Sequence, residues 1–189
     1  MESNAKVEGP EANLFLEERL DEIVFGLQWD PPQGKHGSEP VDLDAICVLF
    51  DEHLNELQVI HPAHPRSEDD SVIHTGDSST GAGTWDDECI FVFLEMLPPH
   101  VSGLVFFVTR ATGEASHEPR GAFCHISDRV SEKVWAKFDL PSLLERSIHA
   151  VATVTRRENG WEITEGSPLV NRDVHLELSR LRSSPLWIA

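Results

Sequence analysis

The chain has 189 residues, of which 40% are hydrophobic and 25% are charged. This length fits one domain with tails and allows a sizeable core without disulfide bonds. With 15 Lys and Arg against 33 Asp and Glu, the formal net charge is -18, which repels nucleic-acid backbones and anionic membranes and attracts cations or basic partners.

The first residues contain no apolar signal segment, and no apolar run reaches the roughly 18 residues that a membrane span needs. Cys47, Cys89 and Cys124 are odd in number and widely spaced, which argues against a disulfide framework. We therefore expect buried thiols and a cytoplasmic protein, with no membrane span and no nucleic-acid partner.

Short runs rich in Val, Ile and Phe follow one another, separated by turns that contain Pro, Gly, Ser or Asn. This pattern is typical of antiparallel β-sheets. Residues 1–20 are expected to be an extension that either forms a short helix or stays mobile. The predicted strands, in chain order, are 22–30, 42–50, 56–60, 71–74, 89–97, 103–110, 121–128, 132–140 and a hairpin over 147–166 with its turn at Asn159–Gly160.

Two later segments have a helical pattern. One is residues 140–147, and the other begins at Val170, where Val170, Val174, Leu178 and Leu181 are spaced by three or four residues. Because strands and helices do not alternate, we predict one all-β antiparallel β-sandwich over residues 21–169, with one or two short helices. Residues 170–189 are then a C-terminal helix and tail, whose last apolar residues either dock on the sandwich or bind a protein partner.

The most unusual segment, residues 77–88, reads DSSTGAGTWDDE and crowds carboxylates before a strand. It has the length of an EF-hand loop, with Asp first and Glu last, but Ala82 stands where that loop requires Gly and no helix follows. Clustered carboxylates need either water to screen them or a cation to bind them.

A second acidic element could complete such a cation site. Asp42 and Asp44 start one predicted strand and, being two residues apart, point to the same face, while Asp30 ends the preceding strand. If the loops bring these residues to the segment 77–88, seven carboxylates meet, and a calcium ion would compensate their repulsion. The alternative is that each carboxylate is separately solvated, and spacing alone leaves both interpretations open.

The order of the segments GLQWD, DLDAICVLFDE, SVIHTGDSSTGAGTWDDECIFVFL, VFFVT, AFCHISD and FDL, continuing through the hairpin NGWEI, resembles the TerD family of bacterial tellurium-resistance and general stress proteins. The resemblance runs from about Phe25 to Gly166, and its most specific parts are Asp42-Leu43-Asp44 and the glycine-rich acidic loop. It implies a β-sandwich that binds calcium through acidic loops, with no catalysis. The ligand candidates that it implies are Asp30, Asp42, Asp44, Asp77, Asp86, Asp87 and Glu88, with backbone carbonyls from Gly81 and Gly83.

This chain departs from the family pattern inside the loop. Ser78 replaces an Asn, and Thr84-Trp85 replaces an Asp-Gly pair, which removes one carboxylate and one flexible glycine. We therefore expect one calcium site, with a second weakened or absent, in a stress-response or signalling module that is not an enzyme.

Two other functions stay as alternatives. The metal could bridge a nucleotide or small anion to the loop, or Asp42, Asp44 and Glu88 could serve a metal-dependent hydrolase. Histidines support neither function by their spacing: His61 and His64 are expected to be a solvated pair, and His74 a surface residue at the rim of the loop.

Overall fold

The structure, a computed structural model, describes residues 20–31, 42–76, 81, 86–110, 121–140 and 148–166, together with the backbone of residues 14–15. Throughout these ranges every helix or strand is a β-strand, and none of the described residues forms a helix able to cross a membrane. The strands are β1 (Leu14–Phe15), β2 (Glu22–Gln28), β3 (Leu43–Phe50), β4 (Glu56–Ile60), β5 (Val72–Thr75), β6 (Glu88–Phe93), β7 (Gly103–Arg110), β8 (Phe123–Asp128), β9 (Val134–Asp139), β10 (Ile148–Arg157) and β11 (Gly160–Glu165).

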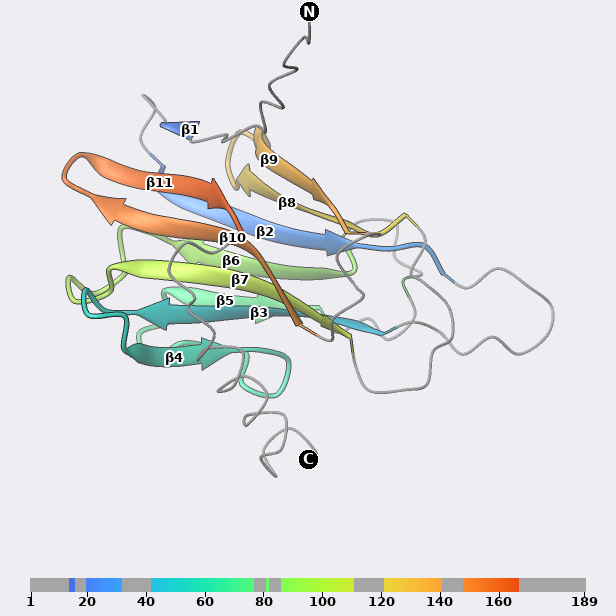
Figure 1. Ribbon diagram of the computed structural model, residues 1–189, viewed down its shortest axis with the longest axis horizontal. Helices are drawn as coiled ribbons and strands as arrows, with labels where there is room; N and C mark the ends of the chain where they lie inside the picture. The colour runs from blue at the N-terminus through green and yellow to red at the C-terminus, as the bar shows by residue number, and fades with distance from the viewer. Residues whose placement is uncertain are drawn as a thin grey trace, which may run out of the picture.

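The strands form two antiparallel sheets that face each other, which confirms the predicted sandwich (Figure 1). One sheet has six strands in the order β1-β11-β10-β7-β3-β4, and the other has five in the order β5-β6-β2-β8-β9. The predicted helices at residues 140–147 and 170–184 lie almost wholly outside the described residues. A helix at residues 14–20 is wrong for Leu14–Phe15, whose backbone pairs with β11.

The main core lies between the sheets and follows from the two-residue repeat of each strand. Leu43, Ala45, Cys47 and Leu49 of β3 are buried on the inner face. At the centre, Phe25 of β2 and Phe106 of β7 stack with ring centroids 4.7 Å apart and an interplanar angle of 4°, so that one aromatic pair joins the two sheets.

The hairpin predicted near the C-terminus is confirmed, but its turn lies one residue earlier than Asn159–Gly160. Arg157 pairs with Gly160, so Glu158 and Asn159 form the turn and Gly160 starts β11. Gly160 has a φ of +141°, a conformation open mainly to glycine, and nothing lies within 4 Å of the place that its Cβ would occupy.

Several strands begin or end together at one end of the sandwich, on the right in Figure 1. Asp44 pairs with Thr109, and Leu27 pairs with Glu88, so β2 and β7 end where β3 and β6 begin. We call this the acidic end, because it carries Asp30, Asp42, Asp44, Asp86, Asp87 and Glu88. The opposite end carries the turns after β3 and β8.

Candidate functional site

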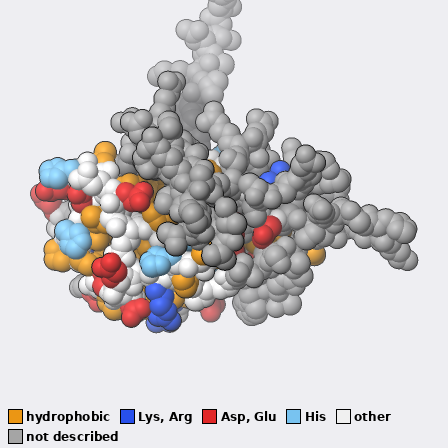
Figure 2. Space-filling model, turned by 90° about the horizontal axis from the view of Figure 1, so that it is seen from below, with side chains coloured by type: hydrophobic (Ala, Val, Ile, Leu, Met, Phe, Trp, Pro, Cys, Tyr) orange, Lys and Arg blue, Asp and Glu red, His pale blue; other side chains and the backbone are white. Residues whose placement is uncertain are grey.

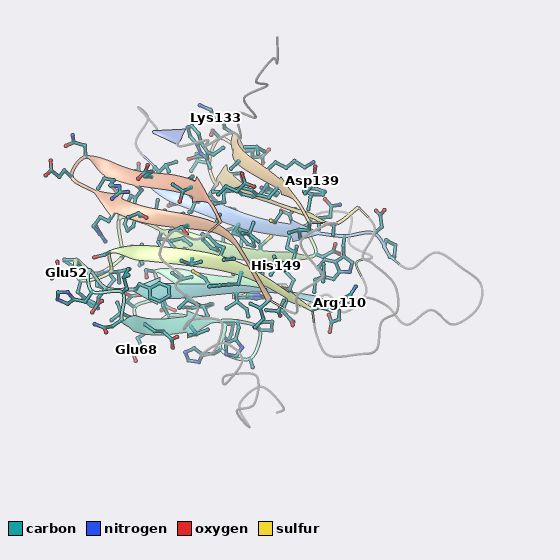
Figure 3. All side chains as sticks on the ribbon, in the orientation of Figure 1. Glu52, Glu68, Arg110, Lys133, Asp139 and His149 are labelled. Carbon is teal, nitrogen blue, oxygen red and sulfur yellow. The ribbon has the colours of Figure 1, made fainter. Side chains whose placement is uncertain are left out.

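The described ligand candidates come from three segments that meet at the acidic end. Asp30 follows β2, Asp42 and Asp44 lie at the start of β3, and Asp86 to Glu88 lead into β6. Arg110 and His149 mark this end in Figure 3, far from Glu52 at the opposite end. Two further candidates, Asp77 and Gly83, lie outside the described residues, as does Trp85.

The three consecutive carboxylates Asp86, Asp87 and Glu88 diverge. Asp86 lies over the outer face of the five-stranded sheet, where its Oδ1 and Oδ2 are 3.1 and 3.0 Å from Nε2 of His125 on β8. Gly26 makes this possible, because a Cβ on that central strand would collide with both the Asp86 carboxylate and the His125 ring. Asp86 therefore interacts with the imidazole of His125 and points away from Asp87 and Glu88.

Asp87 is buried and closes the end of β2. Its Oδ2 accepts a hydrogen bond from the backbone N–H of Trp29 at 3.1 Å, while its own N–H donates to the carbonyl of Leu27 at 2.8 Å. Gly81 reaches the same place from the loop, with a φ of +63° and so little space that a Cβ would collide with the indole of Trp29. Gly81 therefore packs directly on the end of β2.

Glu88 points inward and joins the two sheets. Its side chain is 0% exposed, and its Oε2 accepts a hydrogen bond from the backbone N–H of Ala45 at 2.6 Å. The pairing of β3 with β4 stops at Cys47 and Ile60, so the Glu88 carboxylate takes the place of a strand partner beyond that point. Its other oxygen, Oε1, is buried with no hydrogen-bond donor in the described part of the chain.

His74 is buried beside Glu88, which corrects the expectation of a surface residue. The His74 side chain is 1% exposed, and its Nε2 lies 3.4 Å from Glu88 Oε2. Burial raises the pKa of Glu88 to about 7, although His74 and the Ala45 N–H work in the opposite direction. The nearby Asp44 carboxylate raises this pKa further, so an uncompensated negative charge at this position is unfavourable.

Asp44, on β3, and Asp30, two residues after the end of β2, flank these residues. Asp44 lies on the outer face of the six-stranded sheet, where its Oδ2 accepts a hydrogen bond from Thr109 Oγ1 at 3.3 Å. Asp30 is exposed, and its carboxylate lies against Gly121, where a Cβ would come within 2.7 Å of Oδ2. Gly121 has a φ of +61°, so both its conformation and its neighbour favour glycine.

The structure thus brings the ligand candidates that it describes to one end of the sandwich but gives most of them separate partners. Within the described ranges, no three His, Cys, Asp or Glu side chains form a group that could hold a metal ion. The donors are nevertheless hard oxygen atoms, the type that calcium binds, and Glu88 Oε1 is a buried acceptor lacking a described donor.

Sequence reasoning missed His74 and His125 as partners of these carboxylates. Counting back by two from the buried residues Ile90 and Val92 places Glu88 on the inner face, and counting on from Val72 places His74 there. No comparable signal exists for His125, which is 39 residues from Asp86 in the chain.

The pair His61 and His64 also differs from expectation. His64 is exposed, but His61 is buried, and the two residues form an isolated β-bridge. Nδ1 of His61 accepts a hydrogen bond from the N–H of Ala63 at 3.3 Å, and burial lowers the pKa of His61 to about 4.

Figure 2 shows the described surface seen from the β4 side, where acidic, histidine and apolar side chains lie together.

The expectation of buried free thiols is confirmed for Cys47 and Cys124, whereas Cys89 is a free thiol that is only half-buried. Cys89 Sγ lies 3.8 Å from Asp86 Oδ2, and burial, followed by the Asp86 charge, raises the pKa of Cys89 to about 12. Its thiol is therefore protonated at neutral pH.

A groove of about 460 Å³ lies at the opposite end, away from the ligand candidates, between Leu20, Leu94 and Trp161. Arg156 lines it and stacks on the Trp161 ring at 4.4 Å. Its guanidinium group donates to the carbonyl of Val101 at 2.9 Å and to two further backbone carbonyls at 3.2 Å. This arginine thus anchors the loop between β6 and β7.

Comparison with known proteins agrees with this architecture. The model of the TerD domain matches residues 8–168. The tellurium resistance protein TerZ of Serratia marcescens is 32% identical over 152 residues, which are 77% of this chain and 78% of that protein. General stress protein 16U of Bacillus subtilis is 28% identical over 153 residues, 77% of this chain and 79% of that protein.

A solved structure shows the same fold. The crystal structure of a homologue of telluride resistance protein (TerD) from Streptomyces coelicolor A3(2) matches with a TM-score of 0.66 and 20% identity, covering 78% of this chain and 88% of that one. The resemblance in the segment order is confirmed by a family match over most of the chain. The chain belongs to the TerD domain family.

Proposed function

We propose that the chain is a calcium-binding, non-catalytic module of the TerD type, acting in a stress response as the names of its relatives indicate for those proteins. The observation that carries the proposal is Glu88, a fully buried carboxylate with Oε1 lacking a donor among the described residues. A cation near this oxygen and the neighbouring Asp44 would offset the burial and the Asp44 charge, which together raise the pKa of Glu88.

The donor chemistry of the acidic end fits calcium. The residues that would hold the ion are Asp30, Asp42, Asp44 and Glu88, with Asp77 and carbonyls of the glycine-rich loop, whereas Asp86 is engaged by His125 on the other side of the sandwich. Calcium takes six to eight such oxygen ligands. The ion would supply positive charge and tie the loop to β3, whereas Asp87 already serves the end of β2.

A non-catalytic role is supported by the state of the residues that resemble a catalytic group. Cys89, Asp86 and His125 lie close together, but the Cys89 thiol has a pKa near 12, and a protonated thiol is a poor nucleophile. Asp86 and Asp87 face different partners and therefore cannot act together on one bond.

The proposal is tested by thermal unfolding of chelator-treated protein with calcium, with magnesium or with neither ion. Binding to the folded state stabilises it by about 2.7 kcal/mol at a hundredfold excess over the dissociation constant. For a domain of this size, that predicts a rise of roughly 5 °C or more with calcium. Asp44→Asn and Asp77→Asn should remove most of the rise.

The matched control is Glu52→Gln, which removes a carboxylate at the opposite end, where the Glu52 side chain is 79% exposed. It should keep the full calcium response. No rise in wild-type protein would contradict the proposal. A rise that requires calcium and a nucleotide or phosphate together would instead favour the anion-binding alternative. A cytoplasmic location stays a prediction.

A further inference from the structure

A second apolar cluster lies on the outer face of the six-stranded sheet, away from the main core. It consists of Ile46, Val48 and Phe50 of β3, Val105 and Phe107 of β7, and Ile148 of β10. These side chains are only 0–5% exposed. The described hydrophobic residues that pack on them, Val59 and Ala150, belong to the same sheet. An outward sheet face is buried to this extent only when another layer covers it.

The chain turns onto this face directly after β11. Gly166, with a φ of +70°, donates its N–H to the carbonyl of Val151 at 2.6 Å and accepts a hydrogen bond from Thr153 Oγ1 at 2.8 Å. Thr153 pairs with Val105 in register, so its side chain lies on the outer face beside the cluster. Gly166, the last described residue of the chain, is therefore held beside the cluster.

The segments outside the described residues differ in how many large apolar side chains they could place on this cluster. Residues 111–120 contain no apolar side chain larger than Ala and Pro, residues 32–41 contain one Val, and residues 141–147 contain two Leu. Residues 1–13 contain one Met and one Val, and residues 182–189 hold three large apolar side chains in a row, Leu186, Trp187 and Ile188, without helical spacing. Residues 169–181 contain two Val and four Leu. Four of these, at positions 170, 174, 178 and 181, have the spacing of one helix face.

We propose that residues 170–181 form an amphipathic helix that packs its Val and Leu face on the outer cluster of the six-stranded sheet. The helix makes the sandwich three-layered on this side. The TerD domain match ends at residue 168, so this layer lies beyond the part that the family model describes. It is built from β3, β7 and β10 and does not depend on calcium.

The first test identifies what covers the cluster by photo-crosslinking. A p-benzoylphenylalanine residue replaces Val59, a half-buried side chain at the rim of the cluster, so the core itself is not altered. After irradiation, mass spectrometry should locate the crosslink within residues 170–181 of the same chain. The control replaces Lys137, an exposed residue on the other sheet, and should give no such product. Crosslinks from Val59 to another segment, or to a second copy of the chain, would overturn the proposal.

The second test uses hydrogen exchange and requires no modification of the sheet. In the wild-type protein, amides in residues 170–181 should exchange at least about tenfold more slowly than in an unstructured peptide. Leu178→Asp should abolish this protection, whereas Ser179→Asp, which puts the same charge on the opposite helix face, should preserve it. Exchange of the wild-type segment at the unstructured rate would refute the proposed layer.

Discussion

The two ends of the sandwich use carboxylates in different ways. At the opposite end, Asp51 Oδ1 accepts hydrogen bonds from the N–H groups of His53 and Asn55, both at 2.8 Å, and Asp128 Oδ1 accepts from Ser131 N–H at 2.6 Å. The Asn55 side-chain amide, which donates to Asp51 Oδ2 at 2.8 Å, and then these backbone N–H groups hold the pKa of Asp51 below its usual value, and the Ser131 N–H does the same for Asp128. At the acidic end, burial raises the pKa of Glu88 to about 7.

This contrast shows that acidic residues in this chain are not one class. The carboxylates of the two turn aspartates accept hydrogen bonds from donors in their own turns, so their negative charge is favourable in the folded state. Glu88 is placed where its charge is unfavourable unless a proton or a cation compensates it. Composition alone, with its net charge of -18, does not distinguish the two situations.

The largest effect should appear in the pH dependence of the chelator-treated protein. Because the folded pKa of Glu88, about 7, exceeds its ordinary value of 4.5, this residue favours the folded state below pH 4.5, and that contribution is lost as the pH rises through 7. The loss is about 3 kcal/mol. Glu88→Gln should remove it.

The measurement is the free energy of unfolding in urea from pH 4 to 8, compared between wild type and Glu88→Gln. The difference between the proteins is the quantity to use, because the lowered pKa of His61 gives a slope of opposite sign in both. Parallel curves for the two proteins would show that Glu88 titrates normally and would remove the contrast between the ends.

A smaller effect is expected from the hydrogen bond that Glu88 accepts, which can be tested separately from its charge. Glu88→Ala leaves the buried N–H of Ala45 without its acceptor and should lower the free energy of unfolding by about 2 kcal/mol at pH 7. Glu88→Gln retains an amide oxygen in the same place and should lose much less. Equal losses in denaturant unfolding would mean that the tie between the sheets contributes little.

Gly26→Ala tests where Asp86 lies. The added methyl group forces the Asp86 carboxylate and the His125 ring apart, and the free energy of unfolding should fall by about 1–2 kcal/mol. In a His125→Ala background the methyl group has more room, so the same substitution should be less harmful. An unchanged penalty in that background would indicate that Asp86 does not lie over Gly26.

The smallest effect is expected at the opposite end. Asp128→Ala removes the acceptor of Ser131 N–H and of Val130 N–H and should lower the free energy of unfolding by roughly 0.5–1 kcal/mol. Asp128→Asn keeps an acceptor and should lose less. Neither variant should alter the thermal response to calcium, and a changed response would show that the two ends are coupled.

Much of the fold could be predicted because it is local. The period-two burial of β6 and the Glu158–Asn159 turn both follow from short sequence patterns, although the turn position was wrong by one residue. The second apolar cluster could have been suspected from β3 and β7, whose residues are apolar on both faces, as expected for a sheet covered on both sides.

The candidate site was less predictable because its partners come from distant segments. The family pattern located the carboxylates at one end but not their directions. Asp86 reaches His125 across β2, and Glu88 reaches Ala45 in the other sheet. Such contacts depend on strand order and register, which short sequence windows do not contain.

The central claim, that the acidic end binds calcium, is tested most directly by calorimetric titration of calcium into chelator-stripped protein at pH 7.5, with magnesium as the comparison ion. The account predicts saturable binding of calcium at one site in wild type and in Glu52→Gln, weakened at least about tenfold in Glu88→Gln. Folded wild-type protein that gives no saturable heat with calcium would contradict it, and the acidic end would then be a set of separately satisfied carboxylates.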